Sequence, residues 1–185
     1  MKNYRSFIMV IVLILMIMGL IQFTSPTIGD TLTSILTTIT TIIGLFSVFF
    51  EMRKSANIAL CNFILELQKY FSNDQPTQIA YRELDRLYCK EITDTSKLNR
   101  TEVERYVSFL EMLCDLINKG ALTIKDANQL FGYPFFLAAN NKTVQDMEIK
   151  KYPDYYKNIY KAYPVWVKLR TKNKLSIPFS ETPLI

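Results

Sequence analysis

The stretch TLTSILTTITTIIGLFSVFF (residues 31–50) decides how the chain is built. It carries no charge, yet eight of its twenty residues are threonine or serine. A helix of ~20 residues, rising ~1.5 Å per residue, crosses the ~30 Å hydrocarbon core of a bilayer. The stretch therefore predicts a membrane-spanning helix over about residues 28–50, with an unusual content of hydroxyl groups.

A second apolar run precedes it, from residue 7 to residue 23, and only Gly19 and Gln22 interrupt its apolar character. A cleaved secretory signal is the alternative, but the run exceeds the usual ~7–15 residues and no small-residue cleavage site follows. The two runs together predict a transmembrane helical hairpin over residues 1–51. The basic residues Lys2, Arg5, Arg53 and Lys54 lie outside the two runs, so both termini are expected in the cytoplasm, at a bacterial inner membrane.

The hydroxyl groups of the second predicted span gather on one side of a helical wheel. We call this side the hydroxyl face; it comprises Asp30, Thr33, Ser34, Thr37, Thr40, Thr41, Gly44 and Ser47. Small hydroxylated residues allow helices to approach closely, which favours a packing seam in a homo-oligomer. The same face also suits the lining of a pore, with Asp30 as a ring of carboxylates, or packing against the first span.

Composition limits the chemistry available to the rest of the chain. There is no histidine, and the three cysteines, Cys61, Cys89 and Cys114, match no zinc-binding spacing. None of the five glycines belongs to a phosphate-binding loop. We therefore expect no catalytic residues, metal or cofactor, and a protein that is not an enzyme.

The remaining sequence predicts an all-α cytosolic domain over residues 52–175, followed by an extended tail over 176–185. Its clearest helix begins at Asn99 and carries a continuous apolar stripe to Gly120. A further helix is expected to begin at Thr123. Pro134 and Pro164 are expected to kink or interrupt the helices that contain them.

Positive charge concentrates near the C-terminus. Residues 150–174 contain eight lysines or arginines and one acid, interleaved with aromatic side chains. This pattern suits a small anionic ligand such as a nucleotide, although a solvated or lipid-facing surface is the alternative, and duplex nucleic acid is not expected. The residues predicted to contact the ligand are Asn140, Asn141, Lys150, Lys151, Tyr155, Lys157, Lys161 and Trp166.

Two N-terminal spans followed by a basic, aromatic cytosolic domain resemble the small membrane effectors of prokaryotic anti-phage defence. The closest in layout are CRISPR-associated (type III) membrane proteins that sense cyclic oligoadenylate. The resemblance implies an oligomeric protein whose cytosolic part binds a nucleotide and whose membrane part then conducts ions or perturbs the bilayer. A non-conducting membrane anchor that presents a helical interaction domain is the alternative function.

Overall fold

The computed structural model describes residues 26–92 and 98–184, with side chains from Thr33 onward. These residues form helices joined by turns and contain no strand, so the all-α prediction is confirmed for them. The first predicted span, about 7–23, and with it the hairpin, lie outside the described residues. The chain divides into two units between Ala59 and Leu60.

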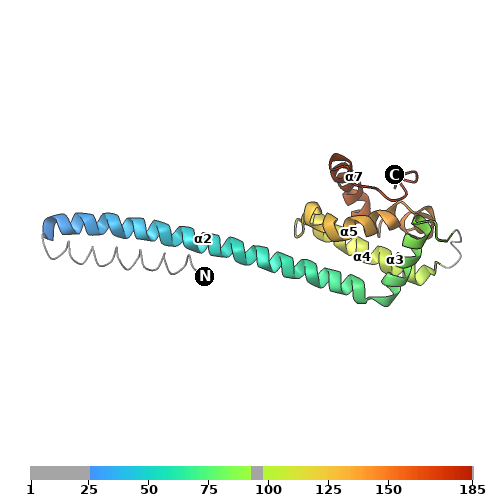
Figure 1. Cartoon of the computed structure of the whole chain (residues 1–185), viewed down its shortest axis with the longest axis horizontal. Helices are drawn as coiled ribbons and strands as arrows, with labels where there is room; N and C mark the ends of the chain where they lie inside the picture. The colour runs from blue at the N-terminus through green and yellow to red at the C-terminus, as the bar shows by residue number, and fades with distance from the viewer. Residues whose placement is uncertain (1–25, 93–97, 185) are drawn as a thin grey trace. The chain divides into compact units, whose positions relative to one another are not determined.

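The longest helix, α2 (Pro26–Asn73), contains the second predicted span and continues far beyond it (Figure 1). The sequence has no glycine or proline between Gly44 and Pro76, so nothing in it breaks the helix. The last turns of α2 contribute Leu67 and Phe71 to the core of the second unit.

The second unit is a helical domain in which α4 (Arg100–Asn118) packs against α3 (Gln75–Tyr88), α5 (Ile124–Ala139) and α7 (Lys157–Lys172) (Figure 1). The predicted apolar stripe of α4 is confirmed, because it forms the centre of the core. Its buried members are Val103, Tyr106, Val107, Leu110, Leu113 and Cys114.

The predicted helix starts are also confirmed. Asn99 accepts a hydrogen bond from the backbone N–H of Thr101 at 2.9 Å and caps α4. Thr123 caps α5 by accepting from the N–H of Asp126 at 3.2 Å. The chain leaves α4 through Gly120, whose φ of 75° favours glycine.

Of the two outcomes predicted at the prolines, a kink or an interruption, the interruption is wrong, because α5 runs through Pro134 and α7 runs through Pro164. At the first site, the buried Tyr106 hydroxyl donates to the carbonyl of Pro134 at 2.7 Å. This bond comes from a neighbouring helix and ties α5 to α4 at the proline. Tertiary contacts of this kind can outweigh the local cost of proline in a helix.

The C-terminal segment after α7 was expected to be an extended tail, but it turns at residues 178–181 and packs on the helical domain. Leu184 is buried, and the carbonyl of Pro178 accepts from the Asn140 amide at 2.9 Å. Arg170 holds the start of the segment by donating from Nε to the Ser176 carbonyl at 2.9 Å. The segment is therefore part of the domain.

Candidate functional site

Most hydroxyl groups on and beside the hydroxyl face of α2 form hydrogen bonds within the helix. The threonine and serine side chains donate to the backbone carbonyl four residues earlier, at 2.7–2.9 Å, in Thr37, Thr38, Thr40, Thr41 and Ser47. A donor without a partner is costly in hydrocarbon. Because these hydroxyl hydrogens are used within the helix, the face tolerates a nonpolar environment and still presents small, weakly polar side chains.

The opposite side of this segment is apolar and uncovered by any described residue. Its large side chains are each 41–60% exposed, in Ile35, Ile39, Ile42, Ile43, Phe46 and Phe49. This segment belongs to α2, which among the described residues is the one helix long and apolar enough to cross a membrane. The mean hydropathy of its apolar window is 1.8. Asp30 belongs to α2, but its side chain lies outside the description.

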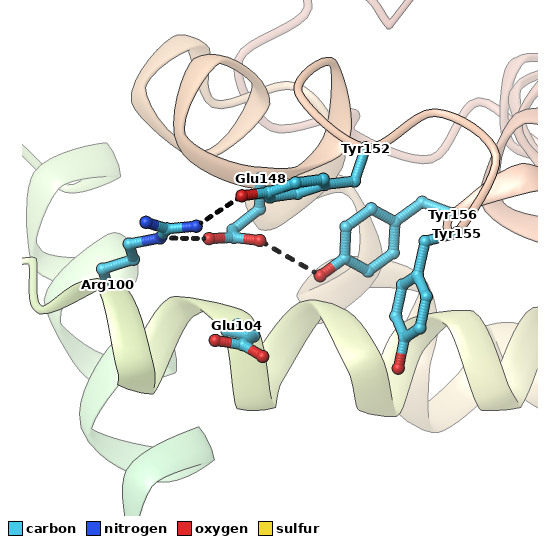
Figure 2. A pocket seen from close by; sticks show the side chains of 6 residues that line it. All are labelled: Arg100, Glu104, Glu148, Tyr152, Tyr155 and Tyr156. Carbon is cyan, nitrogen blue, oxygen red and sulfur yellow. Dashed lines mark hydrogen bonds and ion pairs between the residues drawn. The ribbon is translucent and has the colours of Figure 1, made fainter.

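The helical domain contains a cavity of about 280 Å³ between α4 and the turn that precedes α7 (Figure 2). We call it the tyrosine pocket. It is lined by Arg100, Glu104, Glu148, Tyr152, Tyr155 and Tyr156.

Glu148 reaches the pocket from η1 (Gln145–Ile149), a single turn of π-helix. The short helix α6 (Lys142–Val144) leads into it, capped by Asn141, whose Oδ1 accepts from the N–H of Val144 at 3.1 Å. Gln145 then fixes the turn by donating to the Ala139 carbonyl at 2.7 Å and to the Thr182 carbonyl at 2.9 Å. Turns of π-helix are frequent at functional sites.

The Glu148 carboxylate is only 2% exposed and is held by two groups (Figure 2). Arg100 donates to it from Nε at 2.9 Å, and the Tyr156 hydroxyl donates to it at 3.3 Å. Arg100 also donates to the Tyr152 hydroxyl at 2.8 Å. The hydrogen bond to Glu148 raises the pKa of Arg100, and burial together with the charge of Glu148 raises the pKa of Tyr156.

Four of the six lining residues are open to solvent, and they are Arg100, Glu104, Tyr152 and Tyr155. Glu104 lies one turn after Arg100 on α4, and no cation forms an ion pair with it among residues 26–92 and 98–184. Tyr155 is 65% exposed, and its ring meets that of Tyr156 edge to face, with centroids 4.9 Å apart. Within the described ranges, the pocket therefore presents the exposed ring of Tyr155 and a carboxylate without an ion-pair partner, whereas Tyr156 is buried.

The structure brings some of the predicted ligand residues to this region. Tyr155 lines the pocket, and Lys151 places Nζ 5.4 Å from the ring centroid of Tyr152. Lys150 is exposed beside them, as are Lys157 and Lys161 on α7. None of these lysines lines the pocket itself.

Three other predicted ligand residues are inside the domain and serve its packing. Trp166 stacks on Phe135 at 4.4 Å between centroids and donates from Nε1 to Asn128 at 2.9 Å. Asn140 is fully buried and accepts from the Tyr163 hydroxyl at 2.7 Å. Asn141 is the buried cap of α6. Because burial occupies their polar groups, these three side chains are not available at the surface to a ligand.

Five lining residues were not among the predicted ligand residues, and they are Arg100, Glu104, Glu148, Tyr152 and Tyr156. Arg100 and Glu148 are 48 residues apart, and neither belongs to a motif. The spacing of Arg100 and Glu104 places them on one helix face, but it does not indicate what that face meets.

Metal binding finds no support in the described part of the chain, and the buried thiol is poorly reactive. No group of histidine, cysteine, aspartate or glutamate side chains there is arranged to hold a metal ion. Cys114 is buried, and its burial raises the pKa of the thiol well above the ordinary value, which suppresses the reactive thiolate.

Comparison with known proteins adds no relative. No protein-family model, curated protein or solved structure matches this chain.

Proposed function

We propose that this protein is a homo-oligomeric membrane effector in which α2 crosses the bilayer and pairs with copies of itself through the hydroxyl face. The main support for this proposal is that the surface of α2 has two different sides. One side carries small side chains with internally bonded hydroxyls, and the other carries large apolar side chains that no described residue covers. Packing between membrane helices favours small residues, whereas lipid accepts isoleucine and phenylalanine at little cost. Two spans with both termini in the cytoplasm are part of this proposal.

The helical domain is the part of the protein proposed to bind the ligand. The helix that carries the hydroxyl face also supplies Leu67 and Phe71 to the domain core. A ligand that binds one arrangement of the domain more tightly than another shifts the population of the associated α2 arrangements. The proposed ligand is anionic, a cyclic oligoadenylate in the first instance, because Lys150, Lys151 and Lys157 are exposed and have no acidic partner within the described ranges. A role in antiviral defence follows from the resemblance in layout.

Cysteine cross-linking tests the self-association. Cys61 and Cys89 are exposed and are replaced by serine, while the buried Cys114 is kept. Thr40→Cys places a thiol on the hydroxyl face, and Ile39→Cys is the matched control on the apolar face. We expect oxidation in native membranes to yield dimers from Thr40→Cys and few from Ile39→Cys. Equal cross-linking at both positions, or none at either, contradicts the proposal.

The second candidate function is a non-conducting anchor that presents the helical domain to a protein partner. It is favoured by the internal bonding of Thr37, Thr40, Thr41 and Ser47, whose hydroxyl hydrogens are used within the helix and do not face an aqueous path. Conductance of protein-containing liposomes, with and without cyclic oligoadenylate, separates the two functions. An effector that conducts loses or changes its current on Thr37→Leu/Thr41→Leu substitution, whereas an anchor gives no current in any condition.

A further inference from the structure

Helix α7 carries a row of exposed lysines on the side that faces away from the domain core. They recur at intervals of four, seven and four residues, which places them within about 60° of one another around the helix axis. We call this row the lysine ridge; it comprises Lys157, Lys161, Lys168 and Lys172. We propose that the lysine ridge binds the surface of a bilayer that contains anionic lipid. This inference goes beyond the proposed function, because it depends neither on a nucleotide nor on the pairing of α2.

The packing of α7 leaves the ridge open to solvent. The opposite side of the helix is buried in the domain, through Ile159, Ala162, Trp166 and Arg170. The core therefore fixes the rotation of α7 about its axis and turns all four lysines to the surface.

The charge of the ridge is not compensated. Helix α7 contains no aspartate or glutamate, and none of the ridge lysines forms an ion pair with any residue of 26–92 or 98–184. Exposed lysines elsewhere in the chain do have partners, since Lys69 pairs with Glu66 at 2.8 Å and Lys119 pairs with Asp115 at 2.6 Å. Unpaired lysines gathered on one face are attracted to a surface of negative charge.

A small apolar surface lies beside the lysines. Val165 is 54% exposed, and its neighbour Pro164 is also open to solvent. Both lie between Lys161 and Lys168 along the helix. Lysine stems can cover apolar surface while their ammonium groups stay hydrated. The head-group region of an anionic bilayer provides phosphates for the ammonium groups and an apolar boundary for the valine.

The ridge lacks the aromatic surface that single-stranded nucleic acids use. Bases bind such proteins by stacking on exposed rings. Of the three aromatic residues of α7, Tyr163 and Trp166 are buried and Tyr160 is half-buried, and none lies on the ridge. A bilayer surface is therefore favoured over RNA as the partner.

Surface plasmon resonance with the full chain tests the inference. The protein is placed in nanodiscs of phosphatidylcholine, which is neutral, and passed over immobilised vesicles. The vesicles contain phosphatidylcholine alone or an equal mixture with phosphatidylglycerol. We expect binding to the anionic vesicles only, and a loss of this binding at high salt because salt screens exposed charges. Equal binding to both vesicles, or none to either, overturns the proposal.

A triple substitution locates the binding on the ridge. Lys161→Gln/Lys168→Gln/Lys172→Gln removes exposed, unpaired side chains, so folding is expected to survive, and circular dichroism checks this. It should weaken vesicle binding about a hundredfold, or about fivefold for each lysine.

The matched control removes the same amount of charge from exposed positions outside α7, with Lys69→Gln/Lys119→Gln/Lys125→Gln. It should weaken binding less than about threefold, because distant charges are screened. Equal weakening by the two triple variants would mean that net charge alone drives the binding, and this overturns the proposal.

Immobilised oligoadenylate RNA is the second surface for the same measurement. Stronger binding of the parent protein to RNA than to anionic vesicles identifies the ridge as a nucleic-acid surface and overturns the proposal. The cysteine cross-linking described above reports separately on the pairing of α2. Loss of vesicle binding with intact cross-linking therefore contradicts this inference alone, and the converse result contradicts only the proposed self-association.

Discussion

Arg100 at the start of α4 and Glu148 in η1 form an ion pair of 2.9 Å across the tyrosine pocket. The pair joins segments that lie 48 residues apart in sequence. Its acid is almost fully buried and its base is half-exposed, so water reaches the pair from the arginine side only. Such a pair fixes the geometry of a site more effectively than an exposed one.

Loss of Glu148 should therefore destabilise the domain. Glu148→Ala removes the acceptor of both Arg100 and Tyr156 and should lower the free energy of unfolding by about 1–3 kcal/mol. Urea unfolding of the full chain in micelles, followed by the fluorescence of Trp166, measures the change. The control is Glu66→Ala, which breaks an exposed pair with Lys69 and should have an effect close to zero. Similar losses in the two variants would contradict a structural role for the buried pair.

The bond from Tyr106 to the Pro134 carbonyl should contribute measurable stability. Tyr106→Phe removes only the buried hydroxyl and should lower the unfolding free energy by about 1 kcal/mol. Tyr70→Phe, at an exposed tyrosine, is the matched control. If both variants unfold at the same urea concentration as the parent protein, the hydrogen bond makes no net contribution to the free energy of unfolding.

Alkaline pH should destabilise the domain. Burial raises the pKa of Tyr106 well above the ordinary 10.0, and burial also raises the pKa of Tyr133 and Tyr156. Above pH 10 the unfolded chain loses these protons while the folded chain keeps them, so the stability present below pH 10 declines as pH rises. Each such tyrosine contributes a slope of up to about 1.4 kcal/mol per pH unit.

Urea titrations at a series of pH values from neutral to strongly alkaline measure this dependence, with tyrosinate absorbance as the second readout. Tyr106→Phe should make the decline shallower, because one of the retained protons is removed. A stability that stays constant while exposed tyrosines ionise would contradict the prediction.

A side chain larger than that of glycine at position 132 should destabilise the domain. A Cβ at this position of α5 would meet Asn128 Oδ1, which accepts from Trp166, and, at 2.5 Å, Nη1 of Arg170, whose Nε holds the C-terminal segment. Gly132→Ala should therefore lower the melting temperature and change the fluorescence of Trp166. Gly44→Ala, where a Cβ meets nothing within 4 Å, is the control and should leave both unchanged. Equal behaviour of the two variants would mean that the Asn128 cluster rearranges at no cost.

The sequence alone determined the features that depend on neighbours within one or two helical turns. The cap at Asn99, the apolar stripe of α4 and the apolar segment of α2 are of this kind, because capping and amphipathic periodicity are local properties. Even the back-bonded threonines of α2 follow from an i to i−4 relationship that every helix contains.

The tertiary structure decided which polar side chains face solvent and which meet across the domain. Trp166 and Asn140 looked suited to a ligand, but packing against Phe135 and the C-terminal segment buries them. Arg100 and Glu148 looked unremarkable, but the fold places them together. Burial and long-range pairing arise from the joint packing of α4, α5, η1 and α7, and the local pattern around any single residue does not encode that arrangement.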